Sequence, residues 1–252
     1  MTLDGYTVLV TGAGGGVGQG IARALALDGA HVFVATRSEN GRALAAELTD
    51  AGCRASWVRC DVTVSTSVVD AVAAALTETG HLDALVHNAT SNASSQPHRL
   101  EDVDDALWQD HIGVSVTGAY HCASAAFEAL RERAGTFLVM TSPAGMEGSA
   151  TLPLYATMKG ALRGFAKSLA REWGPHGITV NAVSPLAYSP ALNAAIEADP
   201  AMEERLARRI PLGRIGDPQT DIGSAVAFLV GPRARYLTGQ TIGVDGGHFT
   251  SL

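Results

Sequence analysis

The stretch Thr11-Gly12-Ala13-Gly14-Gly15-Gly16-Val17-Gly18-Gln19-Gly20 joins a short apolar run to a helical pattern. Residues 6–10 before it are mostly apolar and rich in β-branched side chains, which is typical of a buried strand. Residues 21–26 after it place apolar side chains on one helix face. Glycines let a backbone approach a phosphate closely, and a helix start offers free N–H groups and a positive dipole end. The stretch therefore predicts a nucleotide-binding turn rather than a flexible loop.

Strand and helix patterns alternate along the rest of the chain. Strands are predicted over residues 6–10, 31–35, 55–59, 82–87, 136–141, 178–183 and 241–244, and the later helices over 40–51, 65–79, 102–131, 155–173 and 218–230. This rhythm indicates a parallel sheet covered on both faces. We therefore expect an α/β, Rossmann-type doubly wound fold with seven parallel strands. We find no repeat or linker, so residues 1–252 are predicted to form one domain with an insertion at about 187–216.

Composition narrows the class of protein. The 252 residues are 46% hydrophobic, enough for a sizeable core, and the net charge of -7 argues against nucleic acid or an anionic membrane as a partner. No apolar stretch approaches the roughly 18 residues of a membrane span. Residues 1–5 show no basic region followed by an apolar run, so we expect no signal peptide. Three cysteines without metal-binding spacing favour a reducing, cytoplasmic location.

The end of the second predicted strand bears on cofactor choice. In a Rossmann unit this position meets the adenosine ribose, where an acid binds the 2′-OH of NAD and a basic residue accommodates the 2′-phosphate of NADP. Thr36 and Arg37 stand there, and Glu39 begins the next helix. Arg37 favours NADP over NAD, the alternative being a solvated loop residue. Asp61, after the third strand, could cap the following helix or touch the adenine, and these two roles are compatible.

Tyr155 and Lys159 are four residues apart, so both lie on one face of the predicted helix. An ammonium beside a phenol favours the phenolate and lowers the tyrosine pKa from about 10. Such a tyrosine can exchange a proton with a substrate oxygen near neutral pH. The alternative is an ordinary tyrosine and lysine on a helix surface.

Taken in order, these motifs resemble the short-chain dehydrogenase/reductase family in its short, single-domain form. The family pattern T-G-x-x-x-G-x-G is met by Thr11, Gly12, Gly16 and Gly18, and Y-x-x-x-K by Tyr155 and Lys159. Ser142 stands thirteen residues before Tyr155, as the family's catalytic serine does before its tyrosine. Residues 239–247 look like the family's closing strand, so the resemblance covers nearly the whole chain.

The resemblance implies an oxidoreductase that interconverts a small-molecule carbonyl and an alcohol by hydride transfer with NADP. Ser142 would polarise the substrate oxygen, and Tyr155 would act as general acid/base. Lys159 would bind the nicotinamide ribose and lower the pKa of Tyr155. Besides Tyr155 and Lys159, the cofactor-binding residues implied are Gly12, Gly14, Gly16, Val17, Gly18, Thr36, Arg37, Asp61, Val62, Asn88, Ala89, Pro185 and Tyr188.

The resemblance also implies a homotetramer or homodimer, paired through the long middle helix and the Tyr155 helix. Small residues on these two helices suit close approach of helices: Gly118, Ala119, Ala123, Ala125 and Ala126 on one, and Gly160, Ala161, Gly164 and Ala166 on the other.

Three positions depart from the family pattern. Thr90 replaces the glycine of N-A-G, and Leu186 replaces the glycine after Pro185. Ser115 replaces an asparagine that, in the family, helps to hold a water between the lysine and solvent. We therefore include Ser115 among the catalytic residues and expect a slower or rerouted proton relay. These departures keep open a second hypothesis, a cofactor-binding protein with weak or no turnover that serves as a sensor or structural partner.

Several other residues receive a structural interpretation. His87, His98, His111 and His121 do not form a metal-binding spacing and are predicted to be surface or interface residues, so no metal site is expected. Cys122 is predicted to be a small buried side chain and Trp173 a packing anchor. The resemblance implies that the insertion at 187–216 selects the substrate, whose identity the sequence does not specify.

Overall fold

A seven-stranded parallel sheet forms the centre of the computed structural model, which describes residues 2–250. The strands are β1 (Thr7–Thr11), β2 (His31–Thr36), β3 (Ala55–Arg59), β4 (Ala84–His87), β5 (Thr136–Met140), β6 (Thr179–Pro185) and β7 (Thr241–Val244), in the order β3-β2-β1-β4-β5-β6-β7. The order reverses between β1 and β4, where open α/β sheets leave a crevice for a ligand. The predicted fold class is confirmed.

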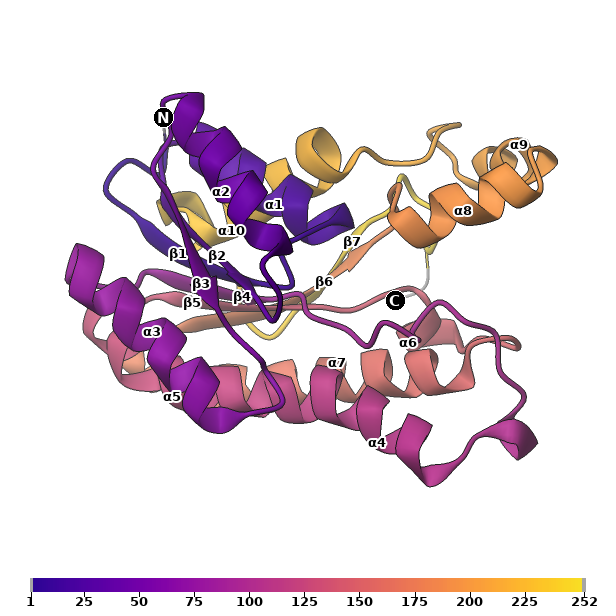
Figure 1. Ribbon diagram of the computed structural model, residues 1–252, viewed down its shortest axis with the longest axis horizontal. Helices are drawn as coiled ribbons and strands as arrows, with labels where there is room; N and C mark the ends of the chain where they lie inside the picture. Colours follow the sequence, from indigo (N-terminus) through magenta and orange to yellow (C-terminus); the bar gives the residue numbers. More distant parts are fainter. Residues whose placement is uncertain (1, 251–252) are drawn as a thin grey trace.

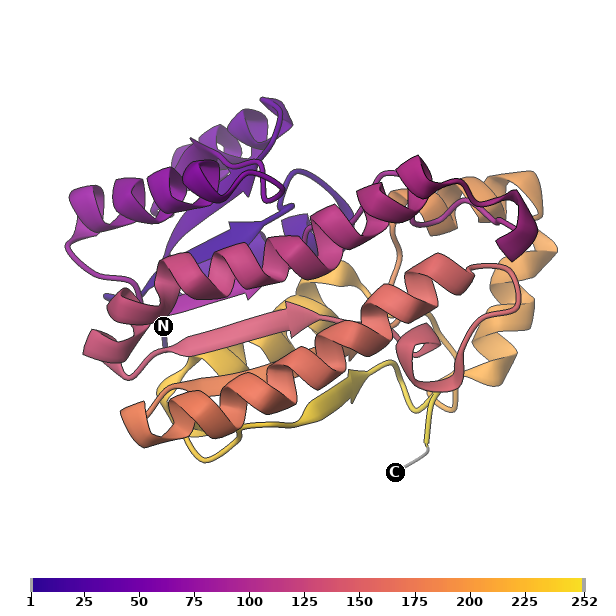
Figure 2. The ribbon, with the colours of Figure 1, turned by 90° about the horizontal axis from the view of Figure 1, so that it is seen from below.

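Helices cover both faces of the sheet (Figure 1). On one face lie α1 (Gly16–Leu27), α2 (Asn40–Asp50) and α10 (Ser224–Val230), and on the other lie α3 (Ser65–Thr79), α4 (Asp105–Ile112), α5 (Gly118–Arg133) and α7 (Pro153–Trp173). Figure 2 shows the second layer from below, with α5 and α7 running side by side. Alternate residues of β1 enter different cores, because Leu9 packs in the α3–α5–α7 cluster while Val8 and Val10 pack in the α1–α2–α10 cluster.

Trp173 anchors the end of α7. Its ring centroid lies 5.2 Å from that of Phe127 on α5 and 5.9 Å from that of Phe137 on β5. Because Trp173 is buried, these contacts join two helices to the central sheet. The predicted packing role of Trp173 is confirmed, as is the burial of Cys122.

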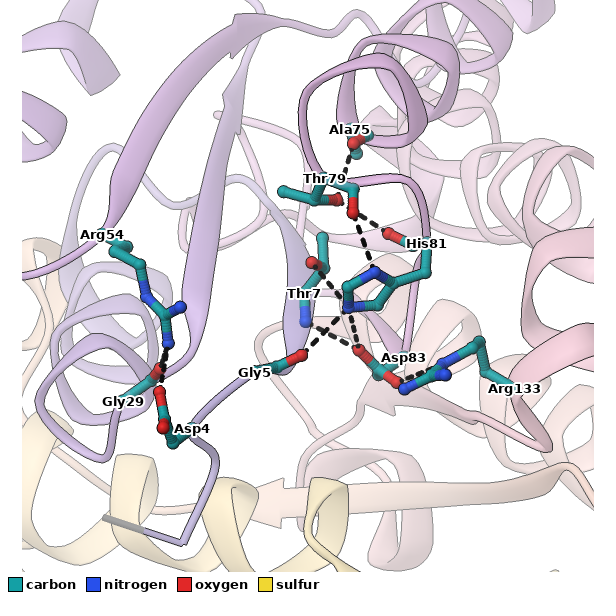
Figure 3. A network of polar contacts seen from close by, with 10 residues as sticks. All are labelled: Asp4, Gly5, Thr7, Gly29, Arg54, Ala75, Thr79, His81, Asp83 and Arg133. Carbon is teal, nitrogen blue, oxygen red and sulfur yellow. Dashed lines mark hydrogen bonds and ion pairs between the residues drawn. The ribbon is translucent and has the colours of Figure 1, made fainter.

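Asp83 joins three elements at the amino ends of the strands, the edge opposite the crevice. Its carboxylate accepts hydrogen bonds from Thr7 N at 2.8 Å and from Arg133 Nε at 2.9 Å, and it lies 3.2 Å from His81 Nε2 (Figure 3). The carboxylate is buried, and donors from β1 and α5 hold it next to β4.

The single helix predicted over 102–131 is wrong. A 3₁₀ turn (Leu100–Asp102), α4, a π-helical turn (Gly113–Thr117) and α5 occupy this region. In the π turn, Gly118 N donates to Gly113 O, five residues back. A π turn inserts one extra residue, which a 3.6-residue periodicity does not detect.

Two other segments also differ from the prediction. Residues 144–147 form the short α6 (Ala144–Glu147), and a π-helical turn (Pro218–Gly223) precedes α10. The insertion carries α8 (Pro190–Ala198) and α9 (Ala201–Arg209), and α9 buries none of its residues. Among residues 2–250, no helix has the length and hydropathy that crossing a bilayer requires.

Five of the small residues expected to pair subunits are used inside the chain instead. On α5, Gly118, Ala119, Ala123 and Ala126 are buried, and the three alanines belong to the core beneath the sheet. The helix turns this face inward because its apolar stripe packs on β4 and β5. On α7, Ala166 is likewise buried in this core, whereas Ala161 and Gly164 are exposed.

The backbone of α1 touches the backbone of the π turn before α10 at Gly20. A Cβ atom on Gly20 would lie 2.3 Å from Pro218 C and 2.4 Å from Pro218 O. Neither atom belongs to a flexible side chain, so the two segments could accept a methyl group only by separating.

We expect Gly20→Ala to lower the free energy of unfolding by about 1–3 kcal/mol, the usual cost of overpacking. Gly113→Ala is the matched control, because a Cβ there meets only Thr63 Cγ2 at 3.8 Å, an ordinary contact. Thermal unfolding of the two variants at equal protein concentration provides the measurement. Equal melting temperatures for Gly20→Ala and wild type would contradict the packing at this site.

Candidate active site

A cleft of about 890 Å³ opens at the carboxyl ends of the strands. Fifteen of the predicted site residues line it: Gly12, Gly14, Gly16, Val17, Gly18, Thr36, Arg37, Asp61, Val62, Asn88, Ala89, Ser142, Tyr155, Lys159 and Pro185. Thr90 and Leu186, two of the departures from the family pattern, also line it. The cleft therefore runs from the ends of β3 and β2, past the glycine turn after β1 and the end of β4, to Ser142 and Tyr155.

The glycine turn is shaped by close contacts that exclude side chains. A Cβ on Gly12 would lie 2.8 Å from Ala89 Cα, and one on Gly18 would lie 2.5 Å from Gly12 O. Gly12 and Gly16 also have positive φ angles of 66° and 54°, which glycine adopts without strain. Gly15 caps α1 without a side-chain acceptor, and the first turn carries no acid. The N–H groups at the start of α1 are thus available to an anion such as a pyrophosphate.

Thr11 fixes the loop after β4. Its Oγ1 accepts hydrogen bonds from Asn88 N at 3.1 Å and from Ala89 N at 3.3 Å. Asn88 Nδ2 in turn donates to Gly12 O at 3.0 Å. These three bonds hold the loop against the glycine turn and form the floor of the cleft.

The ends of β2 and β3 supply polar groups at the far end of the cleft. Thr36 is buried, and its Oγ1 donates to Ser38 O at 2.7 Å and accepts from Trp57 Nε1 at 2.8 Å. Arg37 is exposed and lines the cleft. Asp61 lines the cleft, and its Oδ1 accepts from Thr63 N at 3.0 Å. The predicted capping of the next helix by Asp61 is wrong, because α3 begins at Ser65 after Val64 and no side chain caps it. A contact of Asp61 with the adenine stays a prediction.

Ser142, Tyr155 and Lys159 meet at the other end of the cleft. Ser142 follows β5, while Tyr155 and Lys159 lie one turn apart on α7. Lys159 Nζ donates to Met140 O at 2.7 Å and lies 5.4 Å from the centroid of the Tyr155 ring. Thr141 Oγ1 donates to Lys159 O at 2.8 Å, so α7 is tied to the end of β5.

Burial changes the proton affinities of this pair. It lowers the pKa of Lys159 to about 8, because the ammonium loses water. It raises the pKa of Tyr155, while a hydrogen bond with Ser142 acts in the opposite direction. The expected lowering of the Tyr155 pKa by Lys159 is therefore wrong for the cleft without a ligand. Removing water disfavours both the phenolate and the ammonium, and for Tyr155 this outweighs the hydrogen bond with Ser142.

Two predicted site residues do not line the cleft. Ser115 is buried in the π turn, and its carbonyl accepts a hydrogen bond from His87 Nε2 at 3.0 Å. The Tyr188 phenol donates to Glu203 Oε1 at 2.5 Å, so it is directed toward α9 rather than the cleft. In both cases a tertiary contact that is absent from the local sequence decides where the side chain lies.

The sequence analysis missed several residues that line the cleft. Ser91 Oγ donates to the Asp110 carboxylate, and both residues line the cleft although they are nineteen positions apart. Asn40 also lines it and packs on Gly14. Pro190 at the start of α8 comes within 3.0 Å of the position of a Cβ on Gly16, so the insertion rests on the glycine turn. No local motif predicts any of these contacts.

The surface prediction for the histidines is wrong for two of them. His87 and His111 are 1% and 2% exposed, because both lie on the inner side of the elements that carry them. In the part of the chain that the structure describes, no group of three or more potential metal ligands comes together.

Comparisons with known proteins identify related chains. The family model described as enoyl-(acyl carrier protein) reductase matches residues 12–248. The short-chain reductase protein NovJ of Streptomyces niveus is 38% identical over 246 residues, covering 95% of this chain and 92% of the relative. L-rhamnose 1-dehydrogenase (NAD(P)(+)) of Azotobacter vinelandii is 35% identical over all of both chains. The 3-oxoacyl-[acyl-carrier-protein] reductase FabG of Escherichia coli is 33% identical over 99% of both.

Solved structures are similar over the same length. The 3-ketoacyl-(acyl-carrier-protein) reductase from Brucella melitensis complexed with NADH has a TM-score of 0.88 at 32% identity, covering 98% of this chain and 99% of that chain. A structure from Beutenbergia cavernae with bound NADP has a TM-score of 0.89 at 32% identity, covering 98% of both.

Burial of Lys159 predicts a pH dependence of stability. The unfolded chain keeps this proton up to about pH 10.5, whereas the folded chain releases it near pH 8. The cost of the buried ammonium is therefore present below pH 8 and is relieved as pH rises above it. We expect the free energy of unfolding of wild type to rise by about 2 kcal/mol relative to Lys159→Met between pH 7 and pH 10. Urea unfolding of both proteins without cofactor measures this, and a constant difference would contradict it.

Proposed function

The chain belongs to the short-chain dehydrogenase/reductase family, and from that premise we propose that it is an NADP-dependent oxidoreductase interconverting a carbonyl and an alcohol. One observation carries this proposal. Ser142, Tyr155 and Lys159 line one end of a cleft that also passes a glycine turn with free N–H groups. A dinucleotide extended along the cleft would bring its reactive ring to the three side chains.

Ser142, Tyr155 and Lys159 each have a distinct role in this proposal. When bound, the nicotinamide supplies or accepts the hydride. The Ser142 hydroxyl holds the substrate oxygen, and the Tyr155 phenol gives that oxygen a proton during reduction and takes it back during oxidation. Lys159, whose pKa is about 8, can exchange a proton near neutral pH and orients the cofactor ribose. Preorganised hydrogen-bond donors usually contribute a large share of such a rate enhancement.

The preference for NADP is supported by charge at the end of β2. Arg37 lines the cleft, and neither residue 36 nor residue 37 is acidic. The 2′-phosphate of NADP would gain a charge-assisted hydrogen bond there, while NAD would gain nothing.

A second candidate, a cofactor-binding protein with weak or no turnover, is favoured by Leu186. Its side chain stands beside Pro185 in the cleft, where the family has glycine. Incubating the protein with NADPH and a panel of ketones, aldehydes and quinones separates the two. Binding of NADPH without absorbance change across the panel would favour the second candidate.

We also propose that the chain forms a homodimer or homotetramer and acts in the cytoplasm. Exposed small residues on α7, Ala161 and Gly164, support pairing through this helix, since a Cβ on Gly164 would meet nothing within 4 Å. Tyr120 on the neighbouring α5 is also exposed and would extend the same surface.

Tyr155→Phe removes only the phenolic oxygen. We expect kcat to fall by about 10²–10⁴-fold, the usual contribution of a general acid/base, and the affinity for NADPH to change far less than kcat. Tyr236→Phe is the matched control, because Tyr236 is fully exposed and lies outside the cleft. Steady-state rates and NADPH fluorescence titration measure the two quantities. Retained kcat in Tyr155→Phe would overturn the assignment.

Arg37→Ala tests the choice of cofactor. We expect KM for NADPH to rise about tenfold or more, as loss of a hydrogen bond between charged groups predicts, with little change for NADH. Arg59→Ala is the control, since Arg59 is an exposed arginine on β3 that pairs with Thr36 but does not line the cleft. Equal effects on the two cofactors would show that Arg37 is a solvated loop residue.

A further inference from the structure

His87 is a buried titratable group that the proposed chemistry does not use. It is the last residue of β4, stands directly beside Thr11 of β1 in the sheet, and is 1% exposed. It lies at the point where the strand order reverses, immediately before Asn88 and Ala89 of the cleft. A buried imidazole in this position has its hydrogen-bonding state fixed by its neighbours.

Both ring nitrogens of His87 have partners. Nε2 lies 3.0 Å from Ser115 O, and Nδ1 lies 3.2 Å from Thr11 Oγ1. A carbonyl oxygen only accepts hydrogen bonds, so the ring proton is on Nε2. Nδ1 must then accept, and the Thr11 hydroxyl donates to it. The oxygen of Thr11 remains free to accept from Asn88 N and Ala89 N.

These bonds form a continuous chain with a single direction. It begins at the backbone amides of Asn88 and Ala89, passes through the Thr11 hydroxyl and the His87 ring, and ends at the Ser115 carbonyl. Ser115 belongs to the π-helical turn, which contacts α7. The chain therefore links the floor of the cleft to the turn that packs on the helix of Tyr155 and Lys159.

The His87 ring is also closely packed by its neighbours. A Cβ on Gly118 would lie 3.2 Å from His87 Cε1, and Cys122 Sγ lies 3.6 Å from Nδ1. Burial lowers the pKa of His87 to about 3, and the nearby charge of Lys159 acts in the same direction. The ring is thus neutral throughout the physiological range.

We propose that His87 is a positioning residue: a neutral imidazole, protonated on Nε2, that holds the Ser115 carbonyl and its π turn in register with Thr11 and the loop after β4. Its effect on turnover rests on the proposed function, whereas its effect on the π turn does not. In this arrangement His87 holds the backbone carbonyl of Ser115, not its hydroxyl, next to the helix of Tyr155 and Lys159.

The tautomer is tested first, on the protein without cofactor. In ¹⁵N-histidine-labelled protein, the His87 signals, assigned by their loss in His87→Gln, should report a protonated Nε2 and an unprotonated Nδ1 that stay constant from pH 5 to pH 9. A proton on Nδ1, or a titration within that range, would overturn the proposal.

The positioning role is tested with two matched pairs of variants. Glutamine can donate to Ser115 O and accept from Thr11, so His87→Gln should keep kcat, whereas His87→Phe keeps the ring and loses both bonds. Thr11→Ser likewise keeps the hydroxyl that Thr11→Val removes. We expect kcat to fall about tenfold in His87→Phe and Thr11→Val, with a shifted pH–rate profile. Unaltered rates and profiles in these two variants would mean that the ring only fills space.

Hydrogen exchange provides a readout that needs no turnover. The amide of Gly118, which closes the π turn, should exchange faster in His87→Phe than in His87→Gln or wild type. His31→Gln is the control, because His31 bonds Ser56 Oγ at 2.9 Å at the other end of the sheet. If His87→Phe does not fold, Thr11→Val carries both measurements. Equal exchange in all variants would overturn the proposal, and unequal exchange in a protein without turnover would overturn only the proposed function.

Discussion

A Cβ atom on Gly12 would lie 2.8 Å from Ala89 Cα, so the chain can pass from β1 into α1 only where no side chain is present. This close approach brings the start of α1 beside the loop after β4, at the point where the strand order reverses. It also leaves the first N–H groups of α1 open to the cleft. The cleft, the direction of α1 and the site for an anionic group all depend on this one contact between backbones.

The same region explains why burial, rather than charge attraction, sets the protonation of Tyr155 and Lys159. Lys159 is 4% exposed, and its ammonium donates to Met140 O rather than to the Tyr155 oxygen. Without a ligand, removal of water disfavours both charged forms. A bound anionic cofactor would restore a favourable environment for the ammonium, which couples cofactor binding to the proton affinity of Lys159.

The family resemblance and the parallel seven-stranded sheet were predicted correctly because both depend on local patterns. Apolar runs, helical spacing and the glycine turn each lie within a short stretch of consecutive residues. Tyr155 and Lys159 are likewise neighbours on one helix. The π turn at Gly113–Thr117 was not predictable, since its extra residue leaves the apolar spacing almost unchanged. Tyr188, His87 and His111 were misplaced because their surroundings come from segments far away in the chain.

The sequence by itself determined the fold and the glycine turn, since these follow from short-range periodicity, and its resemblance to a known family singled out the three residues proposed for catalysis. Only the tertiary structure decided how those residues are protonated, which side chains complete the cleft, and what His87 contacts. Desolvation and hydrogen-bond direction depend on atoms brought together from β1, β4, the π turn and α7. No stretch of consecutive residues contains that information.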